Sequence, residues 1–273
     1  MEHVPSFFSS VGINVETYDL RTQQVMEGSA AEGDVEFYRI LAEETGGPVL
    51  ELGSGTGRVT WALAESGIEV LGLEIQDAML MAAESRRWKE TELAQEKASF
   101  DSGDMRSFDL DREFSLILIP YHGFQALLDM ESQRSCLRTA REHLSEDGLL
   151  VIHVFDPRLE LLVEGSEREE DLPVLHDPFN DNIIEASIIQ RELDRVQQVL
   201  REVWKFTELD GSEVPIRQEE ERLEIRWTSR HEMRLLFELE GFDVECEYSD
   251  FEGSEPVYGS EQIWVVRKAK GEG

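Results

Sequence analysis

The stretch VLELGSGTGR, residues 49–58, decides the fold, because an apolar run leads directly into three glycines spaced one residue apart. A short buried strand that ends in such a loop begins a β–α unit, whose ligand crevice lies between the end of the strand and the start of the next helix. Glycine tolerates positive φ and has no Cβ to block a ligand. The stretch therefore predicts a site for a nucleotide-like ligand.

Two common phosphate-binding patterns do not fit this loop. A nicotinamide or flavin fingerprint, G-x-G-x-x-G, would need its third glycine at position 58, which is Arg58. A P-loop needs Lys followed by Ser or Thr after the last glycine, and no such pair is present. A nicotinamide-dependent oxidoreductase is therefore kept only as a weak alternative.

The segments around the loop alternate between strand and helix patterns. We expect strands at 48–53, 68–74, 98–104, 114–120 and 149–155, and helices at 34–47, 58–67, 77–89 and 131–148, the last with a turn at Asp147-Gly148. Such alternation predicts βαβ units around a parallel sheet. A capped helix at 229–242 and strands at 242–248 and 262–268 complete the order.

The pattern changes in the second half of the chain, where residues 182–227 read as long antiparallel strands with a hairpin turn at Asp210-Gly211. We expect the strand around Glu202 to have one apolar face that this glutamate interrupts, and the glutamates at 219–221 to form a solvated edge. The predicted organisation is an N-terminal segment (1–34), a core (35–160 and 229–273) and an antiparallel β insertion (161–228) that acts as a substrate lid.

The charge balance is strongly acidic, with 59 Asp and Glu against 26 Lys and Arg and a net charge of -33. Nucleic acids and anionic membranes bind clustered basic residues, so we expect neither as a partner. The acidity fits either a salty cytoplasm or an ordinary acidic bacterial protein. About 1 M salt shortens the Debye length to roughly 3 Å, so in the first case stability rises with salt. A series of unfolding measurements from low to molar salt distinguishes the two.

Other sequence features suggest a cytoplasmic location. Cys136 and Cys246 match no metal or redox spacing, which suits a reducing compartment. The first residues lack the pattern of a signal peptide, and no apolar run reaches the 18 or so residues of a membrane span. The histidines apart from His122 lie far apart in sequence, so no metal site is expected.

Three acidic positions narrow the choice of ligand. Glu51 stands two residues before Gly53 and suits a cation better than a pyrophosphate. Glu74 ends the second strand, where a carboxylate accepts from ribose hydroxyls. Asp104 could accept from an exocyclic amine, and Met105 could pack on a purine. A ligand with a ribose, an adenine and a positive charge fits this set, and S-adenosylmethionine is such a ligand.

Residues 35–157 resemble the core of class I S-adenosylmethionine-dependent methyltransferases. The family signature E-x-G-x-G-x-G is matched by Glu51, Gly53, Gly55 and Gly57. The resemblance implies an α/β, doubly wound, Rossmann-like seven-stranded sheet whose last strand is antiparallel, with S-adenosylhomocysteine as the product. It implies these cofactor contacts: Tyr18, Glu51, Gly53, Ser54, Gly55, Glu74, Ile75, Asp104, Met105 and Ile119.

The insertion before the last helix resembles that of small-molecule N-methyltransferases. In that family, the end of the fourth strand carries groups that face the substrate, so Tyr121 and His122 are the candidate catalytic residues, and Tyr258 is a candidate for the acceptor pocket. We expect methyl transfer to a small-molecule acceptor, an amine, by in-line displacement. Alternatives are a methyltransferase for peptide or protein N-termini and a non-catalytic S-adenosylmethionine-binding protein; a homodimer is left open.

Overall fold

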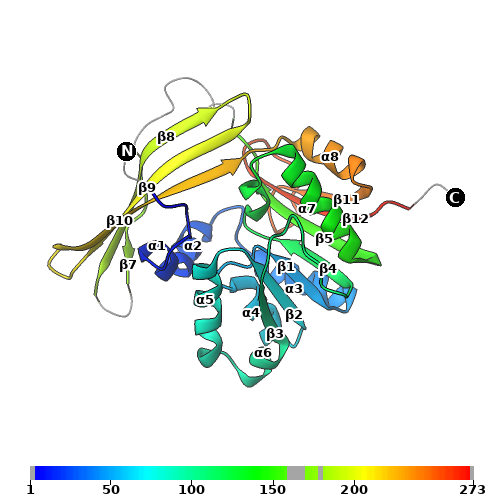
Figure 1. Ribbon diagram of the computed structural model, residues 1–273, viewed down its shortest axis with the longest axis horizontal. Coiled ribbons are helices and arrows are strands. Elements are labelled where there is room, and N and C mark those ends of the chain that lie inside the picture. Colours follow the sequence, from blue (N-terminus) through cyan, green and yellow to red (C-terminus); the bar gives the residue numbers. More distant parts are fainter. Residues whose placement is uncertain (1–3, 159–169, 178–180, 271–273) are drawn as a thin grey trace.

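The computed structural model describes residues 4–158, 170–177 and 181–270, which form two sheets joined by the N-terminal helices (Figure 1). The first sheet runs in the order β3 (Ala98–Ser102), β2 (Val70–Glu74), β1 (Val49–Leu52), β4 (Phe114–Ile119), β5 (Leu144–Phe155), β12 (Glu261–Lys268) and β11 (Phe242–Tyr248). β12 is antiparallel to both of its neighbours, whereas β1 to β5 are parallel. The predicted sheet is therefore confirmed.

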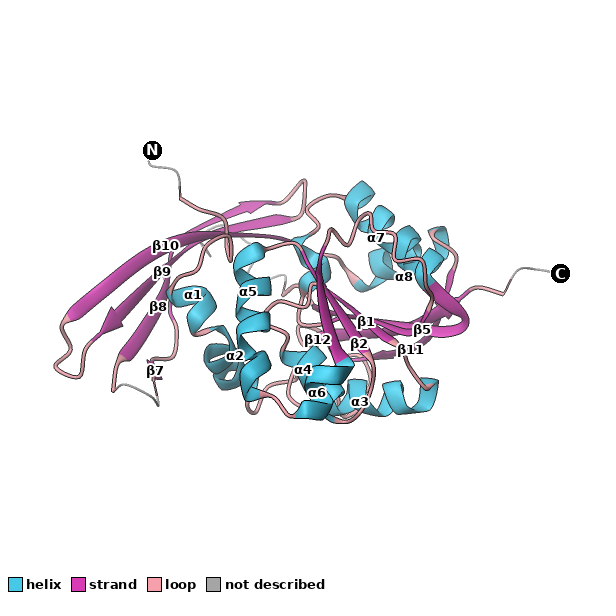
Figure 2. Ribbon diagram, turned by 60° about the horizontal axis from the view of Figure 1, so that its bottom comes forward, coloured by secondary structure: helices cyan, strands magenta, loops and turns pink. Residues whose placement is uncertain are grey.

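Helices cover both faces of this sheet (Figure 2). α3 (Asp34–Thr45), α4 (Arg58–Glu65) and α6 (Glu92–Lys97) lie on one side, and α7 (Met130–His143) and α8 (Arg230–Leu239) on the other. The apolar strands supply both layers, since Leu116 and Leu118 pack toward α3 and α4 while Ile117 and Ile119 pack toward α7 and α8. Burial on both faces explains why these strands read as continuous apolar runs.

Two boundaries in the core differ from the prediction, and one helix was not predicted. α7 ends at His143, and β5 begins at Leu144 rather than 149. Leu144 pairs with Phe114, and the register then shifts, so Asp147-Gly148 forms a bulge within the strand instead of a turn before it. The short helix α6 was not predicted. It follows α5 (Asp77–Arg86) and a single 3-10 turn, and its six residues are too few for a periodic pattern.

The second sheet is formed mainly by β8 (Ile183–Asp194), β9 (Val199–Leu209) and β10 (Pro215–Arg226), in the order β10-β9-β8-β6. Two-residue strands, β6 (Glu170–Asp171) and β7 (Leu175–His176), pair with β8. The turn at Asp210-Gly211 joins β9 to β10 as expected. Residues 159–169, where the predicted insertion begins, lie outside the described residues.

One expectation about the glutamates in this sheet is wrong: Glu221, predicted to lie on a solvated edge, is 1% exposed. Glu202, predicted to interrupt an apolar face, is also buried, at 4% exposed, and accepts hydrogen bonds from Arg191 and from the indole of Trp204. A register shift in β8 between Ile188 and Gln190 disturbs the alternation opposite Glu202, which a period of two cannot anticipate.

The N-terminal segment is fastened to β10. Ser6 forms a parallel bridge to Arg222, and α1 (Ile13–Glu16) and α2 (Tyr18–Met26) follow between the two sheets (Figure 1). Glu221 accepts from the N–H of Phe8 at 3.0 Å and from the Asn14 side chain at 2.6 Å. Among the described residues, no helix has the length and apolarity needed to cross a membrane.

Candidate active site

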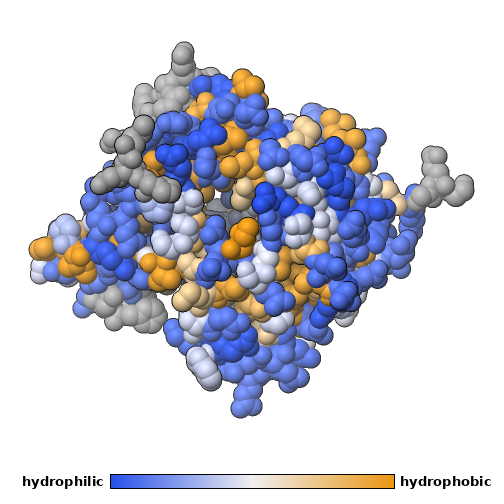
Figure 3. All heavy atoms as spheres, viewed as in Figure 1, coloured by the Kyte–Doolittle hydropathy of each residue, from blue (hydrophilic) through white to orange (hydrophobic). Residues whose placement is uncertain are grey.

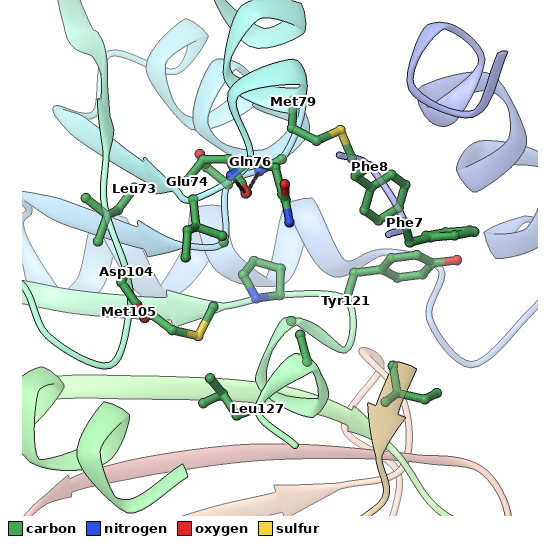
Figure 4. Close-up of a pocket in the computed structure, with 18 of the residues that line it drawn as sticks. Phe7, Phe8, Leu73, Glu74, Gln76, Met79, Asp104, Met105, Tyr121 and Leu127 are labelled. Carbon is green, nitrogen blue, oxygen red and sulfur yellow. Dashed lines mark hydrogen bonds between the residues drawn. The ribbon is translucent and has the colours of Figure 1, made fainter. Parts of the chain in front are cut away.

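A cavity of about 550 Å³ opens where the core sheet meets the second sheet and the N-terminal segment. A hollow is visible between these parts in the space-filling view (Figure 3). Leu73, Glu74, Asp104 and Met105 lie at one end of the cavity, and Phe7, Phe8 and Tyr121 at the other (Figure 4). The site is thus elongated, with a core end and an N-terminal end.

The glycine loop forms the floor of the core end. Gly53 has φ +73°, and a Cβ there would stand 3.2 Å from the Cε of Met105. Gly57 has φ +76°, and its Cβ would stand 2.7 Å from the ring of Phe100. Side chains at both positions would be strained; one at Gly53 would crowd the cavity wall, and one at Gly57 would clash with the ring of Phe100. The loop therefore needs these glycines for its shape and for close approach.

Glu74 ties this loop to the end of β2. Its Oε2 accepts from the N–H of Gly55 at 2.8 Å, and its Oε1 accepts from the N–H of Gln76 at 2.8 Å. Burial raises the pKa of Glu74, and the two N–H groups act in the opposite direction. A carboxylate has about four acceptor sites, so Glu74 keeps capacity for hydroxyl groups in the cavity that it lines.

Glu51 is the most deeply buried acid in the cavity wall, at 3% exposed. Burial raises its pKa to about 8, although hydrogen bonds from Thr60 and the nearby Arg58 oppose the shift. Without a cation beside it, this carboxyl is therefore largely protonated at neutral pH. A cation bound beside it would favour the ionised form.

Asp104 is placed at the cavity but already has a partner. The guanidinium of Arg106 donates to both of its oxygens, at 2.5 Å to Oδ2 and 3.0 Å to Oδ1, and holds the pKa of the carboxyl below its usual range. An adenine amine would share this carboxylate with Arg106. Met105 and the half-exposed Ile75 flank the same end of the cavity and offer the apolar surfaces that a purine needs.

Most of the predicted site residues come together in this one cavity. The predicted residues that line it are Tyr18, Glu51, Gly53, Ser54, Gly55, Glu74, Ile75, Asp104, Met105 and Tyr121. Three others do not line it: Ile119 is fully buried at the end of β4, His122 lies behind Tyr121, and Tyr258 is 55% exposed in the loop before β12.

Sequence reasoning missed several lining residues. Arg58 served there only to exclude a dinucleotide, yet it lines the cavity, lies 6.0 Å from the ring of Tyr121, and makes a two-pronged ion pair with the buried Asp34. Burial alone would lower the pKa of Arg58, but the pairing with Asp34 raises it. Phe7 and Phe8 were also missed, although two adjacent aromatic residues in an otherwise polar segment were a visible signal.

Tyr121 and His122 form a strained pair after β4. Both have positive φ, +41° and +67°, which is unusual for residues other than glycine. Their rings stack with centroids 5.0 Å apart. The Nε2 of His122 lies 3.0 Å from an oxygen of Glu261 on β12, and the backbone N–H of His122 donates to the backbone carbonyl of His153. These contacts hold the turn that presents Tyr121 to the cavity.

The fold brings His153 into the same cluster, although it lies far from His122 in the sequence. Its Nε2 is 3.1 Å from the same Glu261 oxygen, and the possible ligand atoms of the three residues lie within 4.8 Å of one another. A metal on both Nε2 atoms would move the proton of His153 to Nδ1, which is buried without a partner among the described residues. We therefore interpret the cluster as hydrogen-bonded, with both imidazoles donating to Glu261.

This cluster makes stability sensitive to acid. Hydrogen bonds from the two histidines outweigh burial and lower the pKa of Glu261 to about 2, so its stabilising contribution is lost only as pH falls from about 4.5 toward 2. Burial lowers the pKa of His153, which stays neutral while the unfolded chain takes up a proton below about pH 6.5. Stability should therefore begin to fall below about pH 6.5.

We expect Glu261→Gln to lower the unfolding temperature at neutral pH by several degrees. Both imidazoles share one oxygen of Glu261, and a neutral amide oxygen in its place accepts hydrogen bonds about half as strongly as a carboxylate oxygen does. Thermal unfolding at several pH values measures the effect. Glu245→Gln is the control, because Glu245 pairs with Arg267 at the surface of β11. Equal unfolding temperatures for both variants would contradict the prediction.

Comparisons with known proteins show which proteins share this sequence pattern and fold. Residues 49–148 match the family model described as methyltransferase domain. The cypemycin N-terminal methyltransferase of a Streptomyces species is 24% identical over 262 residues, which cover 96% of this chain and 97% of that protein. Among solved structures, the CcbJ methyltransferase from Streptomyces caelestis superposes with a TM-score of 0.77 at 22% identity, covering 97% of this chain and 99% of that one.

A second solved structure, DesVI from Streptomyces venezuelae, has a TM-score of 0.72 at 20% identity and covers 94% of this chain and 99% of that one. At these identities, the solved structures establish the shared fold, including the second sheet. The domain match covers the glycine loop and both strand ends that carry Glu74 and Asp104. Residues 49–148 therefore match a methyltransferase domain, and the chain shares its fold with solved methyltransferases over nearly its whole length.

Proposed function

We propose that the protein transfers the methyl group of S-adenosylmethionine to an amine nitrogen of a small-molecule acceptor. The observation that supports this most directly is the continuous cavity. Its core end carries the adenosine-type contacts, while its other end is enclosed by Phe7, Phe8 and Tyr121 (Figure 4). Such an enclosed end suits a small acceptor, whereas a large folded one would need an open face.

In this proposal, Glu74 binds the ribose hydroxyls, Asp104 the adenine amine, and Glu51 lies beside the cationic aminoacyl end. The chemical step is an in-line displacement at the sulfonium methyl carbon: the amine nitrogen forms the new bond, and the neutral thioether leaves as S-adenosylhomocysteine. Positioning and exclusion of water supply the rate. Tyr121, held by the His122–Glu261 contact, lies where it can orient the acceptor.

The assay is methyl transfer from labelled S-adenosylmethionine to a panel of amino sugars, amino acids, short peptides and hydroxylated analogues, with the product located by mass spectrometry. We expect N-methylated products. Transfer to hydroxyl oxygen alone would overturn the proposal. Cofactor binding without transfer to any acceptor would instead favour the non-catalytic binding protein. A peptide N-terminus remains the second candidate, because a relative over nearly the whole chain is named for that activity.

We expect S-adenosylmethionine to bind more tightly as pH rises toward 8. The cation favours ionised Glu51, whose pKa burial raises to about 8, so binding below that pH releases a proton. Linkage then lowers Kd by up to about tenfold per pH unit between pH 6 and 8. Calorimetric titration in two buffers of different ionisation enthalpy counts the proton. Glu51→Gln should abolish the release, and a wild type that releases none would contradict the prediction.

A further inference from the structure

One wall of the cavity is the edge of a β-sheet. β10 is the border strand of the second sheet, and its residues 222–225 line the cavity opposite the core. β9 occupies only one edge of β10. The other edge offers main-chain N–H and C=O groups, which readily bind a further extended chain.

The N-terminal segment already uses part of this edge. The N–H of Arg222 donates to the carbonyl of Pro5, and the N–H of Phe7 donates to the carbonyl of Arg222, each at 2.8 Å. Arg222 therefore turns both main-chain groups away from β9. In an antiparallel pair this orientation recurs at every second residue, and the register is regular from Arg217 to Arg226. Glu224 must also turn its N–H and C=O outward.

The main chain of Glu224 thus borders the cavity with its N–H and C=O directed away from β9. No described residue outside the sheet donates to or accepts from these two groups. They lie two residues, or about 7 Å, along the strand from the point where Ser6 pairs with Arg222. An extended ligand with an amide could continue the pairing that the N-terminal segment begins.

A second observation concerns the acceptor nitrogen. No histidine or lysine lines the cavity among the described residues, so deprotonation of a strongly basic amine has little assistance. A lysine-like amine has a pKa near 10.4, whereas an α-amino group of a peptide has one near 7.7–8.0. At neutral pH, the fraction of an α-amine that is neutral, and so can attack the methyl group, is therefore a few hundred times larger than that of a lysine-like amine.

We propose that the acceptor is an α-amino amide, a short peptide or an aminoacyl amide, whose first amide pairs with the main chain of Glu224 as an added strand residue. This inference rests on the proposed N-methyltransferase function and specifies its acceptor class. The edge binds the amide, and the adjacent α-amine lies in the cavity toward the methyl donor.

Matched acceptors test the amide. Alanyl-alanine amide, the corresponding ester in which oxygen replaces the amide N–H, and isopropylamine are compared by kcat/KM. We expect the amide to exceed the ester about 3- to 10-fold, the value of one net hydrogen bond, and to exceed isopropylamine by more. Equal kcat/KM for the amide and the ester would overturn the inference while leaving N-methylation intact.

Matched variants test the edge itself. Glu224→Pro removes the N–H, whereas Glu224→Ala removes the same carboxylate but keeps the N–H, and proline is tolerated on edge strands. We expect Glu224→Pro, but not Glu224→Ala, to lower kcat/KM for the amide about 3- to 10-fold, because the N–H at position 224 no longer donates to the carbonyl of the acceptor. Glu220→Pro places proline at an outward position of β10 away from the cavity and should leave kcat/KM unchanged. Equal kcat/KM for the amide in Glu224→Pro and Glu224→Ala would overturn the inference.

A binding measurement separates this inference from the proposed function. Alanyl-alanine amide is titrated into the S-adenosylhomocysteine complex by calorimetry, with unfolding temperatures of all variants as a check on folding. Peptide binding weakened only by Glu224→Pro would support the edge subsite even if no methyl group were transferred. Failure of the peptide to bind would overturn the subsite. Transfer to no amine, with S-adenosylmethionine bound, would overturn the proposed function.

Discussion

Glu74→Ala should weaken S-adenosylmethionine binding about 100-fold, or roughly 2.7 kcal/mol. Two losses combine. The carboxylate no longer accepts from ribose hydroxyls, and hydrogen bonds to a charged group contribute about 1.5–3 kcal/mol each. The N–H groups of Gly55 and Gln76 also lose the acceptor that fixes the glycine loop. Calorimetric titration with S-adenosylmethionine and S-adenosylhomocysteine measures the change.

Glu74→Gln and Glu69→Gln sharpen this test. The amide of Glu74→Gln turns an NH₂ group toward one of the two backbone N–H donors, so it should recover little affinity. Glu69 lies just before β2, pairs with Arg112 at the surface, and should leave the affinity unchanged. A Kd for Glu74→Ala within threefold of wild type would show that the carboxylate does not hold the cofactor.

Asp34→Ala should destabilise the protein by about 3 kcal/mol and lower the unfolding temperature by about 6–12 °C. Asp34 is 2% exposed and holds Arg58 through two hydrogen bonds, at 2.9 and 2.5 Å. Removing the acid leaves a guanidinium without its partner in the cavity wall. The estimate takes the lower end of the range for buried pairs, because the Arg58 side chain is 22% exposed.

Two further variants distinguish destabilisation by the unpaired charge from destabilisation by the simple loss of a contact. A double replacement, Asp34→Leu with Arg58→Met, removes both charges and should restore most of the stability. Glu36→Ala lies on the same helix but breaks only an exposed pair with Arg39, and should leave the unfolding temperature unchanged. If the double variant is no more stable than Asp34→Ala, the loss does not arise from the unpaired guanidinium.

The core of the fold could be predicted because its signals are local. The strand that ends at Gly53 and the acid that ends β2 each occupy a few consecutive residues, and parallel strands bring their carboxyl ends to one edge of the sheet. The cavity accordingly contains Glu51, Glu74 and Asp104 together. The antiparallel insertion was likewise visible in its alternating pattern.

The remaining parts of the site depend on contacts between distant segments. Glu261 meets His122 across 139 residues and His153 across 108, and no spacing in the sequence reports such proximity. The burial of Glu221 depends on Phe8 and Asn14 folding over it, which turns an apparent solvent edge into an interior one. Pattern reasoning treats each strand alone, so it misses charges that become buried only when another segment covers them.

The attachment of the N-terminal segment to β10 has a kinetic consequence. Tyr18 and Phe7 line the same cavity as residues 222–225 of β10, and the segment before α1 is hydrogen-bonded to that strand. A movement that draws β10 away from the core therefore carries the covering segment with it. Under the proposed function, we therefore expect release of S-adenosylhomocysteine and entry of the next acceptor to depend on the same contacts between the N-terminal segment and β10.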